Sequence, residues 1–158
     1  MADANRYFHC LPAQLVPGSI IEPGNWGRII HAYTLVQNNP PGISPVAYRE
    51  LILELVRKLV APKKPSRLNC VFACPTEEEL RVFMSERNNL ADIAYEVEAV
   101  EDSAIHIAGH DLPLLRFQHN EPYFSLIEPL AEAYWIGAPP PKRLEVVIGG
   151  PVKVIRRL

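Results

Sequence analysis

The chain has 158 residues, of which 48% are hydrophobic and 22% are charged, and its formal net charge is −2. This length is enough for one domain, spanning residues 1–158, that buries its own core, and the composition excludes a disordered chain. The slightly negative charge disfavours a nonspecific nucleic-acid binder, because such proteins carry a basic face.

The first predicted element is a short apolar strand, residues 7–11, which carries one histidine, His9. A turn punctuated by proline and glycine then leads into a second extended piece within residues 15–24. After a loop at residues 38–42, Ser44 caps a helix whose first position is Pro45. Apolar residues at three-and-four spacing continue this helix to Leu59, and Pro62 ends it.

The middle of the chain alternates strands and a helix. Residues 67–74 form a nearly continuous apolar run, which is typical of a buried strand. Thr76 and Glu79 have the capping-box spacing, so a second helix begins there. Residues 95–100 alternate as a half-buried strand does, and residues 105–107 are expected to pair with it.

The last third of the chain is expected to be rich in strands. An irregular stretch at residues 109–122 precedes a short helix near residues 124–131. The glycine pair at residues 149–150 fits a hairpin turn between the final two strands. The strands predicted in this part cover residues 133–136, 144–148 and 152–155, and the resulting fold class is α+β.

Three cysteines, Cys10, Cys70 and Cys74, form no CxxC pair, so the sequence predicts neither a zinc site nor a disulfide framework. None of the five histidines is expected to bind a metal. No apolar run approaches the roughly 18 residues that a membrane span needs, and residues 1–6 lack the apolar core of a signal peptide. We therefore expect a protein of the reducing cytoplasm with no metal and no membrane contact.

Three residues are candidates for function, and each has a structural alternative. His9 is either a packed structural histidine or a ligand anchor. Phe72, in the buried run, is by default a core residue. Glu132 precedes the strand predicted at residues 133–136, where an acidic side chain is usually solvated. The pair at residues 110–111, His followed by Asp, could orient an imidazole but has no obvious nucleophile beside it.

The order of these three residues resembles the ADP-ribosyltransferase superfamily, whose core positions are His or Arg, then Tyr or a related residue, then Glu or a related acid. Residues 7–9, Tyr-Phe-His, followed by residues 15–24, are similar to the opening of the rifampicin ADP-ribosyltransferases. Residues 71–80 are similar to their second motif. Residues 64–68 and the strand after them also resemble a small uncharacterised bacterial family near that superfamily.

The chain departs from the superfamily pattern at three points. Phe72 stands where a tyrosine is typical, so a hydroxyl is absent, and Cys10 follows His9 where glycine is common. The acid is Glu132 if it opens a late strand, whereas the rifampicin enzymes use an earlier aspartate, which points to Asp111 instead.

The resemblance implies a split β-sandwich of two small sheets with helices, which binds NAD as a co-substrate in the cleft between the sheets. It implies that His9 bonds a ribose hydroxyl or the nicotinamide amide and that Phe72 packs on the nicotinamide ring. Arg28 or Arg67 would meet the pyrophosphate, because a guanidinium matches phosphate oxygens bidentately. Glu132 would stabilise positive charge on the ribose.

The implied activity is transfer of ADP-ribose from NAD to an acceptor, which is a protein, a nucleic acid or a small molecule. A bacterial toxin or defence effector is one form of this activity, and an inhibitor or antitoxin protein is then a possible partner. The alternative is a catalytically inactive module with the same fold that binds NAD or another protein. The sequence leaves these readings open.

Overall fold

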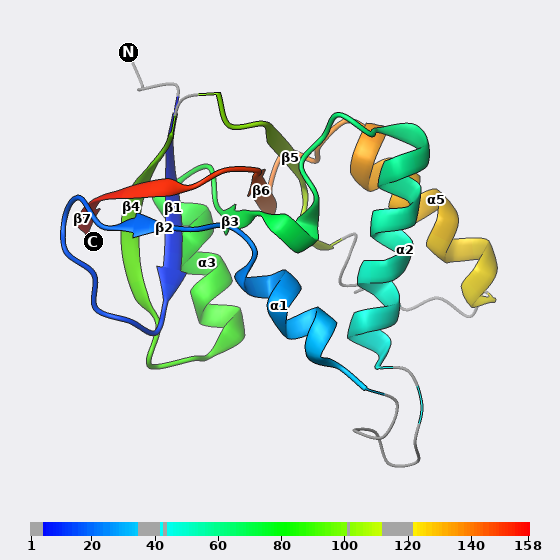
Figure 1. The fold of residues 1–158 in the computed structure, drawn as a ribbon, viewed down its shortest axis with the longest axis horizontal. Coiled ribbons are helices and arrows are strands. Elements are labelled where there is room, and N and C mark those ends of the chain that lie inside the picture. Colours follow the sequence, from blue (N-terminus) through cyan, green and yellow to red (C-terminus); the bar gives the residue numbers. More distant parts are fainter. Residues whose placement is uncertain (1–4, 35–41, 43, 101, 112–121) are drawn as a thin grey trace.

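The computed structural model describes residues 5–34, 42, 44–100, 102–111 and 122–158. Within these ranges the protein is mixed α+β, with four α-helices and two antiparallel sheets (Figure 1). The strands are β1 (Arg6–Leu11), β2 (Ile20–Ile21), β3 (Val71–Ala73), β4 (Ile93–Ala99), β5 (Ile105–Gly109), β6 (Leu144–Ile148) and β7 (Val152–Arg157). The helices are α1 (Asn25–Ala32), α2 (Pro45–Val60), the short 3₁₀ helix η2 (Arg67–Asn69), α3 (Glu77–Arg87) and α5 (Tyr123–Ile136).

Among the described residues, one backbone bridge joins the two sheets. The four-stranded sheet has the order β1-β4-β7-β2, and the three-stranded sheet has the order β3-β6-β5. Phe8 of β1 and Cys74, just after β3, exchange backbone hydrogen bonds of 2.9 and 2.7 Å. This bridge holds the strand that carries His9 beside the strand that carries Phe72.

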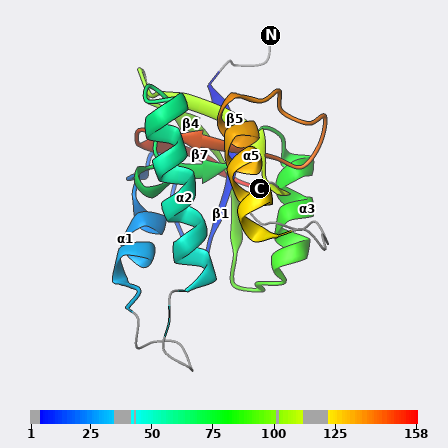
Figure 2. The same cartoon turned by 90° about the vertical axis from the view of Figure 1, so that its right-hand side faces the viewer.

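The hydrophobic core has a part on each face of the three-stranded sheet. Val146 and Ile148 of β6 pack with residues of the four-stranded sheet, whereas Val147 between them packs with α2 and α5. This alternation follows from the two-residue period of a strand. Figure 2 shows the consequence for the helices: α2 and α5 lie together over one end of the molecule, with α1 and α3 to either side.

Helix α1 lies in van der Waals contact with η2 at a glycine. A Cβ atom on Gly27 would lie 1.9 Å from the carbonyl oxygen of Leu68, so only glycine permits this approach. Helix α1 was not predicted from the sequence. Its eight residues carry only Trp26, Ile29 and Ile30 as large apolar residues, and it has no side-chain cap.

Most predicted elements are confirmed. Helix α2 begins at Pro45 after Ser44, and Thr76 Oγ1 accepts the Glu79 amide at 3.2 Å as the cap of α3. Strands β1, β4, β6 and β7 lie where they were expected, with small shifts of their ends. The irregular stretch predicted at residues 109–122 falls largely outside the described residues.

Four local predictions are wrong. Residues 133–136 are the end of α5 and not a strand, because Ile127, Ala131 and Tyr134 continue one buried helical face. Residues 67–69 are η2, so the strand there is shorter than predicted. Strand β5 pairs with β6 and not with β4.

The predicted hairpin is the fourth error. Strands β6 and β7 belong to different sheets, so the glycine pair between them is a crossing and not a hairpin turn. A Cβ atom on Gly150 would lie 2.3 Å from Ser103 Oγ, which explains a glycine in this connection without a hairpin.

A histidine lies buried between the helical layer and the three-stranded sheet. The His106 ring stacks on Trp135 with centroids 5.1 Å apart, and its Nε2 lies 2.8 Å from the carbonyl oxygen of Tyr134. Burial lowers the pKa of His106 to about 4, despite the opposing effect of that carbonyl. The ring is therefore neutral in the folded protein at neutral pH.

We expect Gly27→Ala to destabilise the protein by about 1–3 kcal/mol, because the added methyl group forces α1 away from η2. Urea unfolding followed by circular dichroism measures this change. Gly42→Ala is the matched control, since a Cβ atom there meets nothing within 4 Å. A Gly27→Ala protein as stable as the Gly42→Ala protein would contradict the packing described.

We expect stability to fall by about 2 kcal/mol between pH 7 and pH 5 through His106 alone. In the unfolded state His106 takes up a proton near pH 6.5, whereas in the folded state it does so only near pH 4. Proton binding therefore stabilises the unfolded state relative to the folded state between these two pH values. Urea unfolding at both pH values measures the difference. His106→Gln should show a smaller dependence on pH, and an unchanged dependence would refute the assignment to His106.

Candidate functional site

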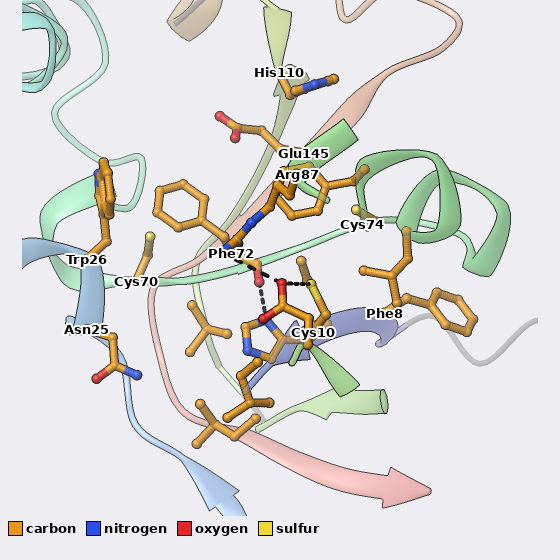
Figure 3. Close-up of a pocket in the computed structure, with 18 of the residues that line it drawn as sticks. Phe8, Cys10, Asn25, Trp26, Cys70, Phe72, Cys74, Arg87, His110 and Glu145 are labelled. Carbon is orange, nitrogen blue, oxygen red and sulfur yellow. Dashed lines mark hydrogen bonds and ion pairs between the residues drawn. The ribbon is translucent and has the colours of Figure 1, made fainter. Parts of the chain in front are cut away.

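A cavity of about 560 Å³ is lined by residues of both sheets and of helices α1, α2 and α3. Its volume lies in the range of small-molecule sites, which is about 300–1,000 Å³. Figure 3 shows Asn25 and Trp26 of α1 on one side, Phe8 and Cys74 on the opposite side, and Phe72 between them. The lining is mainly apolar and aromatic, and its main polar side chains are His9, Arg49, Arg67, Arg87, Asp92 and Glu145.

His9 projects from β1 and is tied to the neighbouring sheet. Its Nδ1 lies 2.6 Å from the carbonyl oxygen of Phe72, so Nδ1 carries the proton and donates it. Burial lowers the pKa of His9, although the carbonyl and the nearby Asp92 act in the opposite direction. The neutral ring therefore keeps Nε2 as an acceptor, and Nε2 bonds to no other described residue.

Phe72 lies in the cavity wall beside His9. One face of its ring is occupied, because the guanidinium carbon of Arg67 lies 4.7 Å from the ring centroid. Its backbone carbonyl is the acceptor for His9, so a hydrogen bond ties the histidine to the strand that carries the phenyl ring. A planar ligand can contact only the face of Phe72 that Arg67 leaves uncovered.

Arg67 lines the cavity but is already committed to protein acceptors. Its Nε and Nη2 donate to the two oxygens of Glu50 at 2.9 and 3.1 Å. Its Nη1 donates to Tyr134 Oη at 2.6 Å and to Glu145 Oε1. Four of its five N–H donors are thus used, so Arg67 has one N–H donor left for the pyrophosphate that it was predicted to contact, and its side chain also holds the site together.

Glu50 neutralises Arg67 inside the protein. Its side chain is 0% exposed, and burial alone would raise its pKa. The charges and hydrogen bonds of Arg67 and Arg49 more than offset burial and lower the pKa of Glu50 below its usual value. Glu50 is therefore ionised at neutral pH and pairs with both arginines.

Glu145 is one of the acids that line this cavity. It is the second residue of β6, its side chain is 16% exposed, and its Oε1 accepts from Arg67 and, at 2.5 Å, from Tyr134 Oη. Its Oε2 has no hydrogen-bond partner among the described residues. One carboxylate oxygen is therefore fixed by the protein, and the other accepts no hydrogen bond from a described residue.

The other end of the cavity holds Asp92, Arg87 and two cysteines. The Asp92 side chain is almost fully buried and lies 3.7 Å from Arg87 Nη2 and 3.8 Å from Cys10 Sγ. Burial, with a contribution from Asp92, raises the pKa of Cys10 to about 11, and burial raises that of Cys74 to about 12. Both thiols are protonated at neutral pH, so neither is an activated nucleophile.

The structure brings together only some of the predicted site residues. His9, Phe72 and Arg67 line the cavity. Glu132 does not: it is exposed on α5, because the strand expected to begin there is a helix. Arg28 is exposed on α1, donates to Asn25 and does not line the cavity. Asp111 also lies outside the lining, paired with Arg143.

Glu145 is the residue that sequence reasoning missed. A signal for it was present, because residues 144–148 were correctly predicted as a strand and Glu145 is the second residue of that strand. The false strand at residues 133–136 directed attention to Glu132 instead. Within the described ranges, no group of three or more His, Cys, Asp or Glu side chains could hold a metal ion, and no helix is long and apolar enough to cross a membrane.

The fold and the cavity define a small α+β protein with a ligand-sized site lined by its two sheets. The family model "Protein of unknown function (DUF2441)" matches residues 29–158, and the chain belongs to this family. The matched range includes Glu50, Arg67, Phe72, Tyr134 and Glu145, whereas β1 with His9 precedes it. No curated protein matches the chain.

We expect Glu50→Gln to destabilise the protein by about 3–5 kcal/mol, because it leaves the buried Arg67 charge without its bidentate partner. Equilibrium urea unfolding measures the change. Glu77→Gln is the control: Glu77 pairs with Arg81 on the exposed face of α3, and its loss should cost less than about 1 kcal/mol. Equal effects of the two substitutions would contradict a buried network.

Proposed function

We propose that this protein binds NAD in the cavity and transfers its ADP-ribose unit to an acceptor. The observation that carries the proposal is that His9, Phe72 and Glu145 line one cavity, each with a free surface for a ligand. In this proposal the two sheets form the split β-sandwich of the ADP-ribosyltransferase superfamily. Glu145, and not Glu132, then takes the acidic position in the superfamily's order of histidine, aromatic residue and acid.

The three residues match the parts of NAD that react. The neutral His9 ring offers Nε2 to a donor, and a ribose hydroxyl is such a donor. The open face of Phe72 packs on the planar nicotinamide ring. The positive charge of that ring favours a site with an aromatic face and a carboxylate oxygen, and Glu145 Oε2 supplies the oxygen.

Arg49 is a better candidate than Arg28 or Arg67 for the phosphate oxygens. It lines the cavity from α2, and its Nε is a buried donor with no partner among the described residues. One of its Nη atoms donates to Glu50 at 3.0 Å, so its guanidinium is partly oriented before a ligand binds. Arginine N–H groups form strong hydrogen bonds with phosphate oxygens.

In the reaction, the bond between ribose C1′ and the nicotinamide nitrogen breaks. Its electron pair goes to that nitrogen, so nicotinamide leaves as a neutral molecule, and positive charge develops on the ribose. A carboxylate oxygen beside the ribose stabilises this charge, which is the role we give to Glu145 Oε2. The acceptor then forms the new bond to C1′ and releases its proton to solvent.

The lining favours a small acceptor within this proposal. The walls are mainly apolar, and the three arginines in them, Arg49, Arg67 and Arg87, already pair with carboxylates of the protein. A nucleic-acid acceptor would need further cations for its phosphates. We also place the protein in the cytoplasm, because Cys10, Cys70 and Cys74 are buried free thiols, as a reducing compartment allows. An inhibitor or antitoxin partner belongs to the effector form of the proposal, which no contact described here favours.

A second candidate is a module that binds NAD without turnover. Two observations favour it: Phe72 lacks the hydroxyl of the typical tyrosine, and Glu145 Oε1 is already occupied by Arg67 and Tyr134. Both candidates share the same binding site. They differ only in whether nicotinamide is released.

We expect the purified protein to release nicotinamide from NAD and Glu145→Gln to slow the release by about 100-fold, because the charge on the ribose loses its partner. His9→Ala should weaken NAD binding about tenfold through loss of one hydrogen bond. Chromatography of nicotinamide and calorimetry with NAD measure the two effects. Glu132→Gln is the control and should change neither.

The outcomes separate the two candidates. Binding of NAD without release of nicotinamide, with several acceptors present, would support the inactive module. Absence of any NAD binding by the wild-type protein would refute both. Equal losses in Glu145→Gln and Glu132→Gln would refute the assignment of the acid.

A further inference from the structure

The carboxylate of Glu145 is held by two donors that also bond to each other. Tyr134 Oη donates to Glu145 Oε1 at 2.5 Å and accepts from Arg67 Nη1 at 2.6 Å, and the same Nη1 donates to Glu145 Oε1. Three groups from α5, η2 and β6 thus form a closed triangle. Both donors act on one oxygen, and Oε2 has no partner among the described residues.

The two donors are themselves fixed. Arg67 lies between two aromatic rings, 4.7 Å from the centroid of Phe72 and 5.1 Å from that of Tyr134, and Glu50 holds it by two bonds. Tyr134 is 1% exposed, and its ring meets Trp135 edge to face at 4.8 Å. Burial raises the pKa of Tyr134 well above its ordinary value, so the hydroxyl keeps its proton and donates.

We propose that Tyr134 is a positioning residue: together with Arg67 it fixes the Glu145 carboxylate so that Oε2 is presented to the ligand in the cavity. The part of this inference that concerns the reaction rests on the proposed function. Tyr134 does not line the cavity and touches no substrate, so it acts only through Glu145. A preorganised carboxylate needs no reorientation when charge develops on the ribose.

Electrostatics explain why a tyrosine is needed beside the arginine. Arg67 already serves two carboxylates, those of Glu50 and Glu145. The uncharged hydroxyl adds a second hydrogen bond to Glu145 Oε1 without adding charge to a buried network. Without it, Glu145 would be held by one donor, and its carboxylate could rotate about the remaining bond.

Tyr134→Phe tests the inference, because it removes the hydroxyl and keeps the ring in its contacts with Arg67 and Trp135. Tyr95→Phe is the matched control. Tyr95 is also 1% exposed, and its hydroxyl makes two hydrogen bonds, to Leu15 N and Ala13 O, but it lies outside the cavity lining. Both variants should lower the melting temperature to a similar extent.

We expect only Tyr134→Phe to lower kcat for nicotinamide release, by about tenfold, with the NAD dissociation constant unchanged. A purely structural role would affect the two variants alike. Equal kcat in the two variants, or a tenfold weaker binding of NAD with unchanged kcat, would overturn the positioning role.

A double-mutant cycle keeps the test independent of turnover. Urea unfolding of wild type, Tyr134→Phe, Glu145→Gln and the double variant measures the coupling between the two side chains without any ligand. Additive effects would overturn the inference even if the protein were an active transferase. If the two side chains are coupled but the protein neither binds NAD nor releases nicotinamide, the conclusion that Tyr134 positions Glu145 would stand and the proposed function would be refuted.

Discussion

The structure depends on one buried ion pair, that of Arg67 with Glu50. Burial of a guanidinium is very costly unless its charge is paired and its donors are largely bonded, so the partners of Arg67, which is almost fully buried, must be held in place. Those partners come from α2, α5 and β6, and η2 supplies the arginine itself. The pair therefore fixes the helical layer against the three-stranded sheet at the point where that sheet meets the cavity.

The cavity itself follows from how the two sheets are joined. The bridge between Phe8 and Cys74 is a single pair of backbone hydrogen bonds, and the sheets do not continue into one another beyond it among the described residues. Helices α1 and α3 contribute opposite walls of the space that remains. Gly27 sets how close α1 comes to η2, so this backbone contact helps to decide the width of the site.

The sequence was informative where a local rule decides the structure. The Ser44–Pro45 helix start, the Thr76 cap and the strand at residues 144–148 depend on neighbours in the chain, and all three are confirmed. Strand pairing and the cross-over at Gly150 depend on distant residues, and both were predicted wrongly. Within residues 133–136, Tyr134 and Trp135 have high β propensity, yet their burial against α2 and the sheet favours a helix.

The same distinction applies to the site. His9 and Phe72 were found because each belongs to a strand that the sequence predicts, and the bridge that brings them together was not predicted. Arg67 was expected, as an alternative to Arg28, to contact the pyrophosphate. No local pattern shows that Glu50, seventeen positions earlier, faces it in the core. Glu132 was chosen from a strand that does not exist.

Burial of this much charge at a cavity wall is itself an argument for function. Replacing a buried ion pair by apolar residues of similar size is often neutral or stabilising, so Arg67, Glu50 and Glu145 are a poor way to gain stability alone. An apolar replacement would fill the same space and would remove the one carboxylate oxygen that the network leaves open. The network is better explained by the carboxylate that it orients than by a gain in stability, because all its hydrogen bonds to Glu145 are made by Oε1 and Oε2 has no partner among the described residues.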